Sequence, residues 1–229
     1  MRGSWCDGMI VEEVDYLKAL EHQQEAVRDL QEGIGGEVLM VLSHPPTITV
    51  GRKGNTSNIV VAPEKLAELG MRVIKTDRGG DVTFHGPGQI VCYPVFNLDA
   101  RRLFPPGHIA NLEEAMARAL DHFGVEPVRV KGIRGIFTRA KKGGSSEPRK
   151  IGAVGVAVAK GIAYHGLALN VLMDLEDFEA IVPCGLSEYE VTSMHLHCAD
   201  PPVVGEVAEV LVDALKGIYG GRFEVRTTF

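Results

Sequence analysis

The chain has 229 residues, of which 45% are hydrophobic and 24% charged, and a formal net charge of −6. This composition supports a globular protein with a substantial core, and the negative charge argues against nucleic acid as the main partner. There is no apolar run of about 18 residues to cross a bilayer. Acidic residues stand where a signal peptide has its apolar segment, so we expect a cytoplasmic protein with no membrane partner.

Helix and strand signals alternate along the first half of the chain. An apolar stripe that includes Leu17 predicts a helix over 15–33, with Gly33 as its C-cap. The other elements expected in this half are two strands over 37–52 divided by Pro45-Pro46, a short helix over 62–70, a strand over 71–77, and two strands over 82–98 divided by a turn at Gly86-Pro87-Gly88.

The second half continues the mixture. Residues 108–124 show the clearest amphipathic helix pattern, 150–171 predict two strands around a turn at Lys160-Gly161, and 204–220 predict a closing helix. Strands follow one another too often for a regular βαβ repeat. We therefore expect one α/β (α+β) domain over 1–229, with a mixed sheet flanked by helices.

Glycines are concentrated in "RGGDVTFHGPGQ", residues 78–89. Gly79 and Gly80 suit a place where bare backbone approaches a ligand. A nucleotide cradle is one interpretation, but the spacing of a phosphate-binding loop is absent. A hairpin built from turn residues is another, although it does not explain the flanking arginine and histidine. The repeated pair His-Gly, at His85 and His165, favours a site that both histidines share.

The cysteines Cys6, Cys92, Cys184 and Cys198 lie far apart without CxxC spacing, which predicts free thiols. Cys92 sits in an apolar run and is expected in the core. Cys184 stands between a proline and a glycine, where a chain reversal presents a side chain. A nearby lysine lowers a thiol pKa from ~8.5 toward neutrality, and the thiolate is the nucleophile. Lys150 is the candidate partner, although the sequence alone does not bring the two together.

Two further patterns have competing interpretations. Residues 139–149 have the composition of a flexible basic loop, and they are either a solvated linker or a docking surface for an acidic protein partner, with RNA a weaker alternative. His195, His197 and Cys198 are either metal ligands or the end of a surface strand. We favour the strand and expect no metal. The basic residues of the wider stretch are Arg129, Lys131, Arg134, Arg139, Lys141, Lys142, Arg149 and Lys150.

The motifs "HPPTITVGR", "RGGDVTFHGPGQ", "KIGAVGV", "HGLALNV" and "PCG", in this order, resemble those of the lipoyl(octanoyl) transferase family, in the biotin/lipoyl protein ligase superfamily. The resemblance extends from about Val38 to Ser193. It implies a single ligase-like domain and transfer of an octanoyl group from acyl carrier protein to a lysine, the first step of protein lipoylation. It implies no cofactor. The acceptors it implies are lipoyl domains of 2-oxoacid dehydrogenase complexes and the glycine cleavage H protein.

The resemblance also implies roles for particular residues. Cys184 matches the acylated nucleophile, and Lys150 matches the lysine that lowers the pKa of its thiol. His165 is a possible supporting residue. The residues that match the segments lining the acyl site are Arg78, Gly79, Gly80, Asp81, Val82, Thr83, Phe84, His85, Ala153, Val154, Gly155, Gly166, Leu167 and Ala168.

Two functions of other classes stay open. As an acyl-thioester hydrolase, the protein would use His165 or His85 as the base for Cys184, with water as the acceptor. As a non-catalytic acyl- or cofactor-binding module, it would bind the acyl group without being modified. The preferred acceptor, the strictness of chain-length selection and the oligomeric state do not follow from the sequence.

Overall fold

A computed structural model describes residues 9–139, 147–183 and 188–229. Two sheets organise these residues, one of six strands in the order β6-β7-β8-β5-β1-β9 and one of three strands in the order β3-β2-β4. The α-helices and strands are α1 (Tyr16–Glu32), β1 (Val38–Leu42), β2 (Thr47–Val50), α2 (Pro63–Glu68), β3 (Arg72–Lys75), β4 (Val82–His85), β5 (Gln89–Asn97), α3 (Pro105–His122), β6 (Ile136–Thr138), β7 (Arg149–Ala159), β8 (Ile162–Asn170), α4 (Val204–Tyr219) and β9 (Glu224–Arg226).

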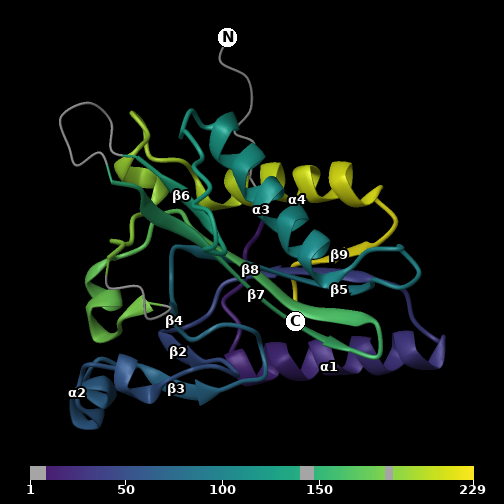
Figure 1. The fold of residues 1–229 in the computed structure, drawn as a ribbon, viewed down its shortest axis with the longest axis horizontal. Helices are drawn as coiled ribbons and strands as arrows, with labels where there is room; N and C mark the ends of the chain where they lie inside the picture. The colour runs from purple at the N-terminus through teal and green to yellow at the C-terminus, as the bar shows by residue number, and fades with distance from the viewer. Residues whose placement is uncertain (1–8, 140–146, 184–187) are drawn as a thin grey trace.

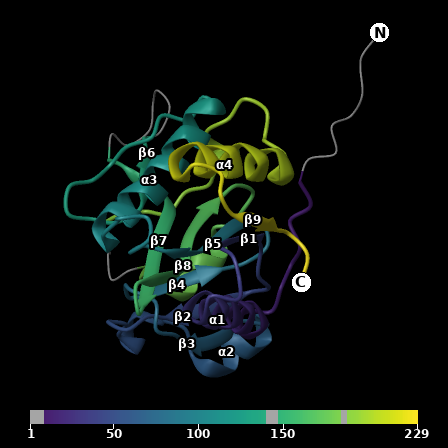
Figure 2. The same cartoon turned by 90° about the vertical axis from the view of Figure 1, so that its right-hand side faces the viewer.

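The large sheet lies between helices (Figures 1 and 2). Helices α3 and α4 cover one face and α1 covers the other, while the small sheet and α2 lie beyond one end of α1. Each face of the large sheet has its own buried apolar cluster, and a third cluster fills the space behind the small sheet. The mixed sheet flanked by helices that the sequence predicts is confirmed.

The helices and strands expected over 15–171 and the closing helix over 204–220 are present, with differences in detail. The two strands over 82–98 belong to different sheets, so the turn at 86–88 joins the sheets and the hairpin interpretation is wrong. The strand expected around His195 is also wrong, because Met194–Leu196 forms a 3₁₀ helix. The sequence analysis missed β6 and β9, which have three residues each and give too little pattern to detect.

The buried face of helix α1 matches the expected stripe only in part, because Ala26 and Val27 are buried as expected and Leu17 is not. Leu17 is 47% exposed, whereas Tyr16 and Gln23 are buried. Gln23 uses its side chain inside the protein, donating to Ala19 O at 3.2 Å and accepting the His165 backbone N–H at 2.8 Å. The buried face therefore carries a polar side chain that hydrogen-bonds to the backbone of β8. A search for apolar periodicity does not detect such a residue. Gly33 does form the left-handed C-cap, with φ of 71°.

Strands β5 and β8 separate locally in the middle of the large sheet. Pairing runs from Gln89↔Asn170 to Cys92↔Leu167 and resumes at Phe96↔Ala163. A Cβ on Gly166 would lie 2.1 Å from the Cys92 carbonyl oxygen, so only glycine fits at this position. The neighbouring His165 has a φ of 56°, and its N–H is satisfied by Gln23 instead of a strand partner. This interruption lets the His165 side chain leave the regular pleat.

No helix among the described residues is long and apolar enough to cross a membrane.

Gly166→Ala should destabilise the protein by roughly 1–3 kcal/mol, because the added methyl has no space against the Cys92 carbonyl. The control is Gly217→Ala on the exposed face of α4, where the nearest atom to an added Cβ is 3.9 Å away. It should stabilise by about 0.5–1 kcal/mol, because alanine has the higher helix propensity. Urea unfolding measures both values, and a neutral Gly166→Ala would contradict the packing described.

Candidate active site

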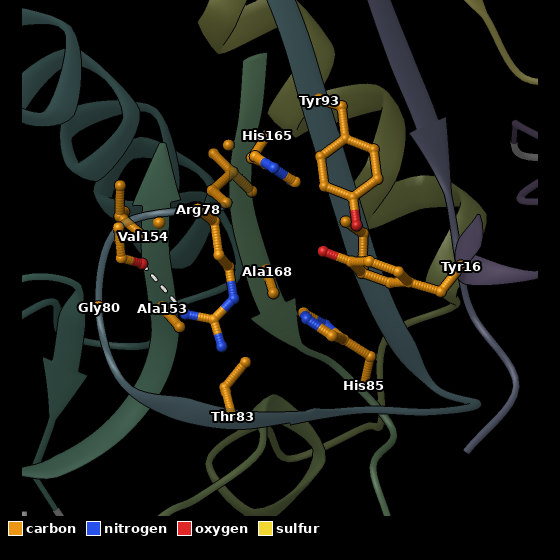
Figure 3. A pocket seen from close by; sticks show the side chains of 15 residues that line it. Tyr16, Arg78, Gly80, Thr83, His85, Tyr93, Ala153, Val154, His165 and Ala168 are labelled. Carbon is orange, nitrogen blue, oxygen red and sulfur yellow. Dashed lines mark hydrogen bonds between the residues drawn. The ribbon is translucent and has the colours of Figure 1, made fainter. Parts of the chain in front are cut away.

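A pocket lies where the two sheets and α1 meet, and we call it the main pocket (Figure 3). It has residues from α1, from β4 with the segment before it, and from β5, β7 and β8. Twelve of the lining residues were predicted from the sequence: Arg78, Gly79, Gly80, Thr83, His85, Ala153, Val154, Gly155, His165, Gly166, Leu167 and Ala168. Three further lining residues, Tyr16, Val91 and Tyr93, were not.

Three predicted lining residues lie away from this pocket. Successive side chains of a strand point to opposite faces, so β4 directs Thr83 and His85 to the pocket and Val82 and Phe84 into the apolar cluster behind the small sheet. Asp81 instead orients a neighbouring loop, accepting the backbone N–H of Asn55 at 2.8 Å. A match of whole sequence segments to a family does not distinguish the residues of a strand that face the pocket from those that face the core.

Arg78 is 7% exposed and braces the loop that leads into β4. Its guanidinium donates to Thr49 O at 2.7 Å, to Asp81 O at 2.7 Å and to Gly79 O at 3.1 Å. Gly79 N donates to Val156 O at 2.9 Å, which ties the loop to β7. A Cβ on Gly155 would lie 2.9 Å from Gly79 O. Glycine is thus needed where the loop meets β7, and that contact shapes one wall of the pocket.

Tyr93 and His44 form a buried hydrogen-bonded pair at the opposite wall. His44 Nδ1 lies 2.6 Å from Val14 O, so this nitrogen donates, and Nε2 accepts the Tyr93 hydroxyl at 2.8 Å. Burial lowers the pKa of His44 to about 4. Tyr16 packs on His44 and stacks on His85, with ring centroids 5.0 and 5.9 Å apart. The aromatic wall is therefore uncharged at neutral pH.

His165 is paired with Asp77 beside the pocket. Its Nε2 lies 2.9 Å from Asp77 Oδ1, and Tyr164 donates its hydroxyl to the other carboxylate oxygen. The hydrogen bond from His165 lowers the pKa of Asp77 to about 2. Burial lowers the pKa of His165 and outweighs the opposing effect of Asp77. The imidazole is thus neutral with its proton on Nε2, and it is locked to a carboxylate.

A second cavity, the lysine cavity, adjoins the main pocket. It is lined by Thr83, Gln89, Lys150, Gly152, Ala153, Asn170, Phe178, Pro183 and Val191. Thr83 and Ala153 line both spaces.

Lys150 is the second residue of β7 and is 7% exposed, with Nζ 5.8 Å from the centre of the Phe137 ring. Cys184 lies outside the described residues. The residue that precedes it, Pro183, lines the lysine cavity.

His165, on β8, lies far along the sheet from Lys150, which is near the start of β7. His165 pairs with Val156, which lies six residues after Lys150. At ~3.3 Å per residue, their backbones are about 20 Å apart along the strand. His85 lines the main pocket but not the lysine cavity, and Gln89 lies between His85 and that cavity. The two histidines share a pocket, and neither lines the cavity that contains Lys150.

The side chains proposed as alternative metal ligands have separate partners. His197 Nε2 lies 2.8 Å from Thr192 Oγ1, and His195 Nδ1 lies 3.1 Å from Ser193 Oγ. Cys198 Sγ points to Phe123 O at 3.8 Å. Within the described ranges, no group of three His, Cys, Asp or Glu side chains is arranged to hold a metal ion.

The basic stretch is only partly described. Arg129 pairs with Glu114 at 2.7 Å and Arg149 pairs with Glu190 at 2.9 Å, both at the protein surface. Lys141 and Lys142 fall in 140–146, outside the described residues. The docking interpretation of this stretch therefore stays a prediction.

Comparisons with known proteins agree with this architecture. The bi-partite lipoate protein ligase of Thermoplasma acidophilum has a TM-score of 0.68 over 96% of this chain and 85% of that chain, at 15% identity. A lipoate-protein ligase A bound with ATP has a TM-score of 0.68 over 97% of this chain and 89% of that chain, at 15% identity. At such identities these matches show the fold alone. The fold is that of the lipoate ligases, as predicted.

Sequence matches define the family more closely. Residues 15–216 match the model of the lipoyl protein ligase A/B catalytic domain, and the chain belongs to this family. The octanoyltransferase of Chloroflexus aggregans is 42% identical over 90% of this chain and 91% of its own length. The octanoyltransferase of Acidobacterium capsulatum is 41% identical over 83% of this chain and 80% of its own length. The family recognised from the motifs is confirmed.

The buried histidines predict an acid-sensitive stability. In the unfolded chain the His44 imidazole binds a proton near pH 6.5, whereas in the folded protein it does so only near pH 4. The free energy of unfolding should therefore fall as pH decreases through this window. His44→Gln should reduce that slope by up to ~1.4 kcal/mol per pH unit. Urea titrations at several pH values measure it, and an unchanged slope would contradict the neutral, buried state of His44.

Proposed function

We propose that this chain is an octanoyltransferase that moves an octanoyl group from a carrier-protein thioester, through a thioester on Cys184, to a lysine of a lipoyl-accepting domain. The activity follows from its relatives, which are octanoyltransferases at about 40% identity over most of the chain. One observation supports the chemical assignment. Lys150 and Pro183, the residue before Cys184, line one cavity, and that cavity shares Thr83 and Ala153 with the main pocket.

The first half-reaction is a thioester exchange. The Cys184 thiolate, stabilised by the Lys150 ammonium, attacks the carbonyl carbon of the carrier thioester. The bond to the carrier sulfur breaks, and the departing thiolate takes the proton from Lys150. This exchange is close to isoenergetic because one thioester replaces another. It leaves the octanoyl group on Cys184 and a neutral amine on Lys150.

The second half-reaction is aminolysis. The ε-amino group of the acceptor lysine attacks the same carbonyl carbon, and the neutral Lys150 amine takes a proton from the attacking nitrogen. An amide forms and the Cys184 thiolate leaves, again beside a Lys150 ammonium. Conversion of a thioester to an amide is downhill, so the cycle closes without ATP. Lys150 serves both steps because its charge changes with the state of the cysteine.

The main pocket suits the acyl tail. Val91 of β5, together with Ala153 and Leu167 of the facing strands, supplies apolar wall next to the lysine cavity. At ~0.8 kcal/mol per buried methylene, six methylenes contribute about 5 kcal/mol, which is enough for coarse selection of chain length. Tyr16 and Tyr93 stand at the wall formed with α1 and β5.

The proposed donor is octanoyl-acyl carrier protein. The proposed acceptors are the lipoyl domains of 2-oxoacid dehydrogenase complexes and the glycine cleavage H protein. The Thermoplasma ligase of the same fold is described together with its E2 lipoyl domain, which supports acceptors of this class. We place the reaction in the cytoplasm, where reducing conditions keep the Cys184 thiol available.

Changes at Cys184 and Lys150 test the mechanism. Cys184→Ser should lose both the acyl adduct and transfer, because a hydroxyl ionises far less readily than a thiol. Lys150→Ala should move the pH midpoint of Cys184 alkylation by iodoacetamide upward, toward ~8.5, and reduce transfer at neutral pH by about two orders of magnitude or more. Lys150→Arg should keep much of the low midpoint while impairing aminolysis, because a guanidinium does not accept the proton.

Cys92 and Cys198 provide the controls for this experiment. Cys92 is buried, and burial raises the pKa of its thiol. Replacing either with alanine should leave the adduct in place. An alkylation profile of Cys184 that does not respond to Lys150→Ala would refute the dyad, even though the family assignment would stand.

The hydrolase and binding-module hypotheses predict different products. Intact mass is measured after the protein is mixed with octanoyl-carrier protein but no acceptor domain. We expect a lasting adduct that disappears when the acceptor is added. Rapid release of free octanoate would favour the hydrolase, and binding without any adduct would favour the module. The distance between His165 and Lys150 along β7 argues against His165 as base for a nucleophile in the lysine cavity.

A further inference from the structure

Two buried amides form the back of the lysine cavity. Gln89 of β5 and Asn170 of β8 are 2% and 4% exposed, and they are register partners in the large sheet. Both line the cavity that contains Lys150. Neither was singled out by the sequence analysis. A buried polar side chain is costly unless it is hydrogen-bonded, so the partners of these amides indicate what they are for.

The direction of every hydrogen bond in this group is fixed by one backbone carbonyl. Thr192 O only accepts, so the Asn170 atom 3.0 Å away is the amide nitrogen. Asn170 Oδ1 then accepts from Gln89 Nε2 at 2.9 Å, and the same nitrogen reaches Phe84 O at 3.3 Å. Gln89 Oε1 is left to accept from His85 Nδ1 at 2.7 Å. His85 Nδ1 therefore carries a proton, and because burial lowers the pKa of His85, the ring is the neutral Nδ1–H tautomer.

The Thr192 carbonyl, at the end of this series of hydrogen bonds, belongs to a segment that is hydrogen-bonded to the backbone of Lys150. Thr192 N donates to Lys150 O at 2.8 Å, and Lys150 N donates to Glu190 O at 2.8 Å. These two bonds form a single parallel bridge between β7 and Val191. Residues 190–192 follow the part of the chain that carries Cys184. The bridge thus joins the segment that follows that part of the chain to the backbone of Lys150.

Asn170 connects this bridge to the large sheet. Its amide nitrogen is a side-chain donor from β8 to the carbonyl of Thr192, one peptide beyond the bridge at Val191. Thr192 is 1% exposed, so a carbonyl left without its donor there has little access to water. Ser193 Oγ adds a further tie by accepting Met173 N at 3.1 Å.

We propose that Asn170 is a positioning residue for the acyl-transfer step, holding the 190–192 segment against β7 so that Lys150 and the chain that carries Cys184 keep a fixed relation. It acts through the Thr192 carbonyl and does not touch the reacting atoms. The inference rests on the proposed octanoyltransferase mechanism. Gln89 supports it by occupying Asn170 Oδ1, which leaves the amide nitrogen directed at Thr192.

Asn170→Leu tests the proposal, because leucine has a similar size and no donor or charge. We expect kcat to fall at least tenfold, the pH midpoint of Cys184 alkylation to rise, and KM for octanoyl-carrier protein to stay within about twofold. A merely structural role would lower the melting temperature without moving the alkylation midpoint. Asn170→Asp, which keeps the acceptor for Gln89 and loses the donor to Thr192, should reduce kcat as well and serves if the leucine variant does not fold.

The matched control is Asn97→Leu, at the other end of the β5–β8 pair. It removes the side-chain oxygen that accepts Ala100 N–H at 2.9 Å, so it should lower the melting temperature while kcat and the alkylation midpoint stay near their wild-type values. Wild-type kcat and midpoint in a folded Asn170 variant would overturn the proposal. If Cys184→Ser still forms the adduct, the octanoyltransferase mechanism has failed, whatever Asn170 does.

Discussion

The backbone bridge between Lys150 and the 190–192 segment is the contact on which the proposed site depends. It is formed by two hydrogen bonds of 2.8 Å at the start of β7. Several described elements meet near Lys150 at this bridge. Strands β6 and β8 flank β7 in the sheet, Phe137 lies near the amine, and Thr192, just beyond the bridge, accepts a hydrogen bond from Asn170 of β8.

This arrangement separates two tasks in space. The lysine cavity contains Lys150 and the amides that fix its surroundings, whereas the main pocket is lined by glycines, small apolar side chains, aromatic rings and the Arg78 guanidinium, which donates to backbone carbonyls. The histidines support that division. Burial lowers the pKa of His44 and of His85, so neither brings a charge to the acyl tail at neutral pH. The wall formed by Tyr16, Tyr93 and His85 is thus uncharged, and the Arg78 guanidinium, held by backbone carbonyls, is the cation that lines the described part of the pocket.

The sequence predicted the architecture well because its signals are local. Periodicity located the helices, and β-branched runs between turn residues located the long strands. Most of the main pocket was predictable because its residues lie in three short, contiguous motifs, 78–85, 153–155 and 165–168, which a sequence match can locate. Val82 and Phe84 were included with them because a motif match does not distinguish the two faces of a strand.

The parts that could not be predicted depend on contacts between distant residues. Tyr16 reaches the pocket from a face of α1 that also carries the buried Gln23, and the apolar periodicity of the helix does not point to that face. The roles of Gln89, Asn170 and Thr192 follow only from their hydrogen bonds, which join residues 22 and 81 positions apart. The turn at 86–88 looked like a hairpin because the sequence does not show that β4 and β5 enter different sheets.

The central claim is that Cys184 carries the octanoyl group while Lys150 controls its charge. The most direct measurement is peptide mapping by mass spectrometry after the protein is mixed with octanoyl-carrier protein and quenched in acid. The account predicts an octanoyl group on the peptide that contains Cys184, lost again when the acceptor domain is added before quenching. An adduct on Cys6, Cys92 or Cys198, or on Cys184 but never passed to the acceptor, would contradict it.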